Sequence, residues 1–390
     1  MSAARGRSRT SGTTRFILLA AVVGVVLAFA VMVYRNTGNE VSAAPDFEGE
    51  GSGNALLHVE PGDTLGVVGD RLYDIGTVAS TRAFTGAAAG TSVEGIQPGY
   101  YQVREEMSAA SAVEALADPR NRVGFMDVKP GGLLLDTVVV GGGTEKGIFT
   151  LIADATCLRD LDDPEAPPMC RLPQEIVDAA VQADPAELGV PDWAINEVRA
   201  APDPVRRLEG LIAPGVHNVS PQSEPLEILR QLIDSSTDAY DATGLVPSAE
   251  RIGLTPYQVV TAASLVEKEG TLEDFDKIAR VILNRLDEPM RLQFDSTVNY
   301  ALADQEIATT DADRAAVTPW NTYAMDGLPY GPIGSPGLDA LRAMENPAEG
   351  RWKYFVTVDM QGTTRFADEY PEHERYQSEA IANGVLSSGR

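Results

Sequence analysis

Residues 255–270 read TPYQVVTAASLVEKEG and predict the central helix of the larger domain. Thr255 is a good N-cap residue because its hydroxyl can accept a hydrogen bond from a free N–H of the first turn. Pro256 suits the first helical position, where an N–H would have no partner within the helix. Gly270 is typical of the residue that ends a helix. The stretch therefore predicts a helix over residues 256–269.

Two glutamates lie in the last turn of this predicted helix. The carbonyl ends of a helix disfavour a negative charge, so the pKa values of Glu267 and Glu269 should be raised. Neighbours on a helix surface are three and four residues apart, so these two side chains face different directions. Glu269 follows Leu265 and Val266, and this apolar surrounding favours it as a general acid. The alternative is that both glutamates are solvated surface acids, the usual place for this residue type.

Polar residues and a long loop follow this helix. Residues 274–302 predict a helix with an apolar stripe and then an irregular polar stretch. Residues 320–337, WNTYAMDGLPYGPIGSPG, predict a loop rich in proline and glycine. Its Asn321 and Tyr323 suit the wall of a sugar groove, because amide groups and aromatic faces match N-acetyl groups and pyranose rings. Packing of the loop over the helices is the alternative.

The composition excludes several classes of function. The chain has 57 acidic and 31 basic residues, a formal net charge of −26, so no general electrostatic binding of nucleic acid is expected. It has three histidines and two cysteines, without CxxC, HExxH or EF-hand spacing. We therefore expect neither a metal nor a cofactor.

An apolar segment near the N-terminus predicts a single-pass membrane anchor. Residues 16–34 are uncharged, four arginines precede them, and Arg35 follows directly. This charge distribution places residues 1–15 in the cytoplasm, a transmembrane helix at 16–35, and the rest of the chain outside. A cleaved signal peptide is the alternative. Outside the cytoplasm, a disulfide bond between Cys157 and Cys170 is favoured over two free thiols.

The predicted fold class is α+β, with an anchor helix, a small α+β module and a mostly helical domain that ends in a β-hairpin and a helix. The predicted boundaries are a linker at 36–54, the module at 55–130, a connecting region at 131–204 and the helical domain at 205–390. A helix is also expected at 144–156, and the hairpin is expected at 353–358 and 363–366.

Several strings resemble the MltG/YceG family of membrane-anchored endolytic murein transglycosylases. In chain order they are SLVEKEG, VILNRL, MRLQFDSTVNYAL, WNTYAMDGLPYGPIGSPG and KYFVTVD, followed by His373. Upstream, LEGLIAPGVHNV at 208–219 resembles another family element, and VEPGDTL at 59–65 resembles its LysM-like module. The chain departs from the usual family residues at Trp320, Gly270, Gly215 and His217.

The resemblance implies a site and a reaction. It assigns Glu269 as the catalytic acid and then base that cleaves the bond between MurNAc and GlcNAc and leaves a 1,6-anhydroMurNAc end. The substrate-binding residues that it implies are Gln293, Asp295, Asn321, Tyr323, Gly327, Leu328 and Pro329. It also implies glycan strands as substrate and contact with cell-wall synthases such as penicillin-binding proteins. His373 is expected to be a packing residue.

Two other functions are compatible with the same residues. One is a non-catalytic, membrane-tethered glycan-binding protein in which the two glutamates are surface acids. The other is a muramidase that uses two carboxylates, with Glu267 or Asp295 as the second.

Overall fold

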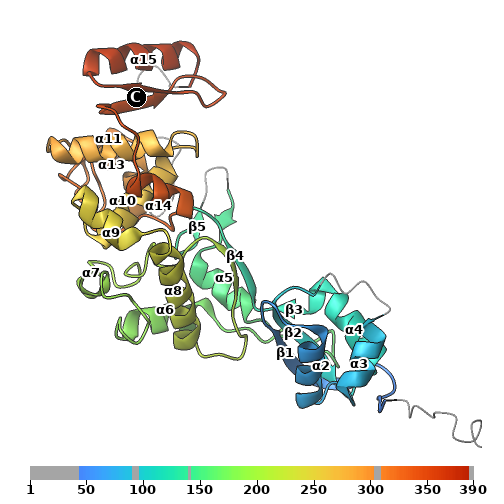
Figure 1. Ribbon diagram of the computed structural model, residues 1–390. Coiled ribbons are helices and arrows are strands. Elements are labelled where there is room, and N and C mark those ends of the chain that lie inside the picture. The colour runs from blue at the N-terminus through green and yellow to red at the C-terminus, as the bar shows by residue number, and fades with distance from the viewer. Residues whose placement is uncertain (1–43, 90–95, 139–141, 303–308, 386–390) are drawn as a thin grey trace, which may run out of the picture.

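The computed structural model describes residues 44–89, 96–138, 142–302 and 309–385. Three hydrophobic cores follow one another along an elongated molecule, with the N-terminal module at one end and the last helix at the other (Figure 1). The predicted tail and transmembrane helix, residues 1–35, lie outside the described residues. Among the helices that the structure describes, none combines the length and hydropathy that a membrane crossing requires.

The N-terminal module packs three helices against a three-stranded sheet. Its elements are β1 (Ser52–Val59), α2 (Leu65–Asp74), α3 (Thr81–Ala88), β2 (Gly99–Glu105), α4 (Ala109–Ala117), a 3₁₀ turn (Pro119–Asn121) and β3 (Arg122–Val123), with strand order β1-β2-β3. Thr64 caps α2 through its side chain, and Val68 and Leu72 are buried as the sequence pattern predicts. The sequence did not predict α3, a short helix that is held by the burial of Phe84.

The middle of the chain forms the second core. Its elements are β4 (Phe125–Val128), β5 (Thr137–Val138), β6 (Thr144–Glu145), α5 (Ile148–Ala155), α6 (Pro173–Gln182), α7 (Ile195–Arg199), β7 (Gly215–Asn218) and α8 (Pro225–Asp241). The antiparallel pairing of β4 with β7 joins the residues before 131 to those after 205. The predicted disulfide bond between Cys157 and Cys170 is formed.

The helix expected at 144–156 begins later than predicted. Thr144 and Glu145 pair with β5 as a strand, so their backbone is not available to a helix. The helix α5 starts at Ile148, after Gly147, whose N–H is bound by the side chain of Asp136.

The third core surrounds α10 (Pro256–Glu269). The other elements are α9 (Leu245–Ile252), α11 (Phe275–Asp287), α12 (Asp295–Ala301), α13 (Asp311–Ala315), α14 (Leu338–Glu345), β8 (Tyr354–Thr357), β9 (Thr364–Ala367) and α15 (Tyr370–Ala382). Helix α10 contacts α9, α11, α12 and α14, and residues 259–266 are at most 1% exposed. The predicted cap is confirmed, since Thr255 and Gln258 form a capping box and Pro256 is the first helical residue. The predicted hairpin is β8–β9.

The structure confirms that Gly270 ends α10 and corrects the prediction for the stretch after α11. Gly270 ends α10 with an extended backbone (φ −149°), not with a left-handed one. A Cβ there would lie 2.2 Å from Cδ1 of Ile278, so packing against α11 excludes a side chain. The stretch after α11, expected to be irregular, contains the helix α12, whose seven residues are too few to show a clear helical period.

Candidate active site

Glu269 is the last residue of α10, and its carboxyl group meets the first turn of α12. The Ser296 hydroxyl donates a hydrogen bond to Oε1 of Glu269. Burial raises the pKa of Glu269 to about 7, and the charge of Asp295 raises it too, whereas hydrogen bonding from Ser296 and the charge of Arg285 lower it. The carboxyl group therefore keeps its proton to a higher pH than an ordinary glutamate, as suits a group that first donates and then accepts a proton.

Glu267 faces another way, as the helical spacing predicts. Its Oε2 accepts a hydrogen bond of 3.0 Å from the backbone N–H of Gly337, at the start of α14. Burial raises its pKa, and the hydrogen bond from Gly337 opposes that effect. Glu267 thus joins α10 to α14, while Glu269 meets α12.

Asp295, the first residue of α12, is held in an ionised state. Its Oδ1 accepts hydrogen bonds from the hydroxyls of Tyr323 (2.7 Å) and Thr309 (2.9 Å) and from Nε of Arg314 (3.1 Å). A second guanidinium nitrogen of Arg314 donates to Oδ2 at 3.0 Å. Burial raises the pKa of Asp295, but the hydrogen bonds from Arg314, Tyr323 and Thr309 outweigh it and keep the pKa below its ordinary value.

Gln293 and Asn321 differ in exposure and in their partners. Gln293 is exposed and has a positive φ of 52°, an unusual backbone conformation for a residue other than glycine. Asn321 is 1% exposed, and its side-chain amide donates to the carbonyls of Asp313, Arg314 and Ala316. Its Oδ1 accepts from the backbone N–H of Tyr323 at 2.9 Å. Asn321 therefore shapes the loop, and Gln293 is free to reach a ligand.

The three other predicted site residues lie at the opposite end of α10. Gly327, Leu328 and Pro329 line a cavity of about 340 Å³ together with Thr255 and Tyr257 from the start of that helix. A helix of 14 residues is about 21 Å long, so this cavity and Glu269 are separated by much of its length. The structure thus brings Glu269, Asp295 and Tyr323 together and places residues 327–329 apart from them.

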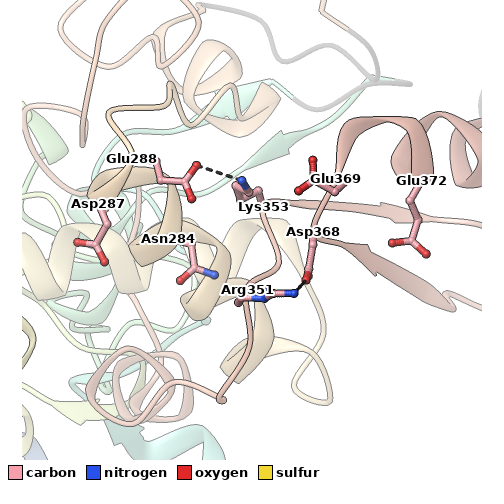
Figure 2. Close-up of a pocket in the computed structure, with 8 residues that line it drawn as sticks. All are labelled: Asn284, Asp287, Glu288, Arg351, Lys353, Asp368, Glu369 and Glu372. Carbon is pink, nitrogen blue, oxygen red and sulfur yellow. Dashed lines mark hydrogen bonds and ion pairs between the residues drawn. The ribbon is translucent and has the colours of Figure 1, made fainter.

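Figure 2 shows another pocket, between the end of α11 and the C-terminal hairpin and helix. Its volume is about 520 Å³, and its lining side chains are all polar: Asn284, Asp287, Glu288, Arg351, Lys353, Asp368, Glu369 and Glu372. Lys353 pairs with Glu288 and Arg351 with Asp368, as the dashed lines in Figure 2 show. The pocket contains none of the predicted site residues.

Three further observations concern the predicted residues and their neighbours. His373 stacks on Tyr354 with ring centroids 5.2 Å apart, in agreement with a packing role. The sequence reasoning missed Ser296 and Arg314, because only the folded chain brings them to Glu269 and Asp295. Among the described residues, no group of three or more His, Cys, Asp or Glu side chains could hold a metal ion.

Comparison with known proteins identifies the family from the sequence. A model of the YceG-like family matches residues 57–379. Two proteins named endolytic murein transglycosylase, from Streptococcus pneumoniae D39 and R6, are 28% and 26% identical over 343 residues. Each match covers 83% of this chain but only 58% of the pneumococcal protein. A protein of that name from Bacillus subtilis 168 is 24% identical over 330 residues, covering 84% of this chain and 85% of its own.

A solved structure has the same fold. The crystal structure of a putative YceG-like protein from Listeria monocytogenes matches with a TM-score of 0.53 and 20% identity, over 83% of this chain and 99% of that one. The family model itself extends from the first strand of the N-terminal module to the last helix. This chain therefore belongs to the YceG-like family.

Proposed function

We propose that this protein is an endolytic peptidoglycan transglycosylase with Glu269 as its catalytic acid and base. The observation that carries the proposal is the position of Glu269, which has a pKa of about 7 and lies beside an ionised Asp295. Pairs of carboxyl groups with pKa values pushed apart are typical of sites for glycosidic cleavage. The names of the relatives from S. pneumoniae and B. subtilis support the substrate class.

The reaction needs a single group that first donates a proton and then accepts one. Protonated Glu269 donates its proton to the glycosidic oxygen between MurNAc and GlcNAc, and the bond from that oxygen to C1 of MurNAc breaks. The ionised carboxylate then accepts the proton of the MurNAc C6 hydroxyl, whose oxygen bonds to C1 and closes the 1,6-anhydro ring. The attacking group belongs to the same sugar, so its effective concentration is high. Ser296 stabilises the ionised state of Glu269 between the two steps.

The remaining predicted residues receive separate roles. Exposed Gln293 contacts the sugar, and Tyr323 presents its ring beside Asp295. Asn321 shapes the loop that carries Tyr323. Residues 327–329 contact glycan further along a strand that follows α10. Asp295 is a poor second nucleophile, because Arg314, Tyr323 and Thr309 already occupy its oxygens. This favours the transglycosylase over the two-carboxylate muramidase.

The location and the modules are part of the same proposal. Residues 16–35 anchor the chain in the cell membrane with the N-terminus in the cytoplasm, and the helical domain at 205–390 acts outside, where it meets cell-wall synthases. The part of residues 55–130 that ends at β3 forms a LysM-like module, since β4 belongs to the second core. The order β1-α2-α3-β2, with two helices between two antiparallel strands, supports this assignment.

The test is product analysis by mass spectrometry after incubation with uncrosslinked peptidoglycan. We expect fragments that are one water lighter than hydrolysis products from the wild-type chain, and none from Glu269→Gln. Glu267→Gln is the matched control, since it changes the neighbouring glutamate that binds Gly337, and it should retain the product. Reducing MurNAc ends would instead establish a hydrolase. Glycan binding without cleavage would establish a tethering protein.

A further inference from the structure

Glu209 is a second buried glutamate close to the candidate site. Glu209 is 3% exposed, and it precedes β7 in the chain. The Tyr300 hydroxyl donates a hydrogen bond of 2.9 Å to Oε2, and the backbone N–H of Leu134 donates to Oε1 at 3.2 Å and Oε2 at 3.4 Å. One carboxyl group thus connects three segments of the chain, including α12.

Tyr300 and Ser296 lie four residues apart on α12, so they share one face of the helix. From this face, Ser296 donates to Glu269 and Tyr300 donates to Glu209. The two hydroxyls therefore fix one short helix between two glutamates from different parts of the sequence. A change at one end of α12 should be transmitted to the other.

Helix α12 depends on such tertiary contacts. It has seven residues and no side-chain hydrogen bond at its N-cap, and helices this short are unstable in isolation. At its C-terminal end, Arg206 donates to the carbonyl of Tyr300 at 3.2 Å and lies over the rings of Tyr300 and Trp320. The Tyr300 hydroxyl is the group through which this end reaches Glu209.

We propose that Glu209 is a positioning residue, which acts through Tyr300 to orient α12 so that Ser296 reaches Glu269. The importance of this for catalysis rests on the function proposed above, whereas the coupling of the two hydrogen bonds is a property of the fold. Since the bond from Ser296 favours the ionised form of Glu269, loss of the Tyr300 hydroxyl should raise the pKa of Glu269.

The charges around both glutamates separate this coupling from a direct electrostatic effect. The ionisable groups that face Glu209 are Arg206, Lys268, Tyr257, Tyr300 and, across a cavity of about 220 Å³, Asp136. Those that face Glu269 are Asp295, Arg285 and Tyr323. Removing a negative charge at Glu209 would by itself lower the pKa of Glu269. The proposal predicts the opposite sign for variants that break the contact with Tyr300.

The experiment measures the pKa of Glu269 by carboxyl ¹³C NMR on the full chain, with its signal identified by its loss in Glu269→Gln. Ser296→Ala and Tyr300→Phe should each raise that pKa by about one pH unit, the size expected for a lost hydrogen bond to a charged group. The double variant should show no further increase, because both changes remove the same bond. Glu209→Leu should reproduce Tyr300→Phe, and Glu209→Gln, which keeps an acceptor, should restore most of the wild-type value.

Tyr376→Phe is the matched control. Tyr376 also donates its hydroxyl to a glutamate, Glu372, at 3.1 Å, but both lie on α15. An unchanged pKa of Glu269 in Tyr300→Phe, or additive shifts in the double variant, would overturn the proposal even if the variant were less stable. Absence of anhydro product from the wild-type chain would refute the proposed function and leave the measured coupling intact, so the two failures are distinguishable.

Discussion

Ser296 donates its hydroxyl hydrogen bond to Glu269, although 27 residues separate the two in the sequence. The bond joins the end of α10 to the start of α12, and it acts on a carboxyl group that has a pKa of about 7 and lies beside Asp295. Burial raises the proton affinity of Glu269 most, and two neighbours on α12 change it in opposite directions. Ser296 lowers it, and the neighbouring negative charge of Asp295 raises it.

Ser296→Ala should move the alkaline limb of the pH–activity profile upward by about one pH unit. The reason is that the protonated form of Glu269 starts the proposed reaction, and loss of the hydrogen bond to its ionised form raises its pKa. The measurement is the rate of anhydro-product formation from about pH 5 to 9. Ser378→Ala, which removes a hydroxyl on α15 that binds the Glu374 carbonyl, should leave the profile in place.

Asp295→Asn should move the same limb in the opposite direction. Its negative charge raises the pKa of Glu269, so its removal lowers that pKa and the proton is lost at lower pH. Asp326→Asn is the control, because Asp326 pairs with Arg291 at 2.9 Å on the exposed part of the loop. A profile that shifts upward in Asp295→Asn would contradict this account of the site.

The stability of the protein should depend on the protonation of Glu209. Burial raises the pKa of Glu209 from 4.5 to about 7, against hydrogen bonds from Tyr300 and Leu134, so the folded chain binds this proton more tightly than the unfolded chain. The resulting stabilisation is complete below pH 4.5 and is lost as the pH rises to about 7. Between these limits the wild type should lose roughly 3 kcal/mol more than Glu209→Gln.

The measurement is urea unfolding of both chains at about pH 4.5 and pH 8. Comparison of the two chains cancels the contributions of other titrating groups, which they share. Equal pH dependence in wild type and Glu209→Gln would show that Glu209 has an ordinary pKa in the folded state.

Gly270→Ala should destabilise the helical domain by about 1–3 kcal/mol, the usual effect of overpacking a core. Its Cβ would lie 2.2 Å from Cδ1 of Ile278, which is fully buried on α11. Adding Ile278→Val removes that methyl group and should recover part of the loss. Gly86→Ala is the control, since a Cβ there meets nothing within 4 Å and alanine favours helix α3. Thermal unfolding of the four chains checks the order.

Local sequence signals were sufficient for the elements that local interactions define. Thr255 and Pro256 mark the start of α10, and the spacing of Glu267 and Glu269 in its last turn sends their side chains in different directions. The hairpin β8–β9 was predicted for the same reason, because its strands are adjacent in the chain. Recurring strings indicated the family that the comparisons then established.

Local sequence signals could not predict contacts between distant segments of the chain. The sequence placed Asn321 in a binding loop, but only the fold shows that its amide is used by backbone carbonyls. Gly270 was predicted to end the helix, but only the fold shows that the close approach of Ile278 requires a glycine there.

The sequence by itself determined the helix that carries Glu269 and the direction in which this side chain leaves it, because caps and helical spacing act within a few residues. Only the tertiary structure decided which groups meet that carboxyl group. Ser296 and Asp295 reach it through the packing of α12, and Glu209 holds that helix through Tyr300. The pKa of a buried carboxyl group depends on such neighbours and on its removal from water, and both arise when distant parts of the chain pack together.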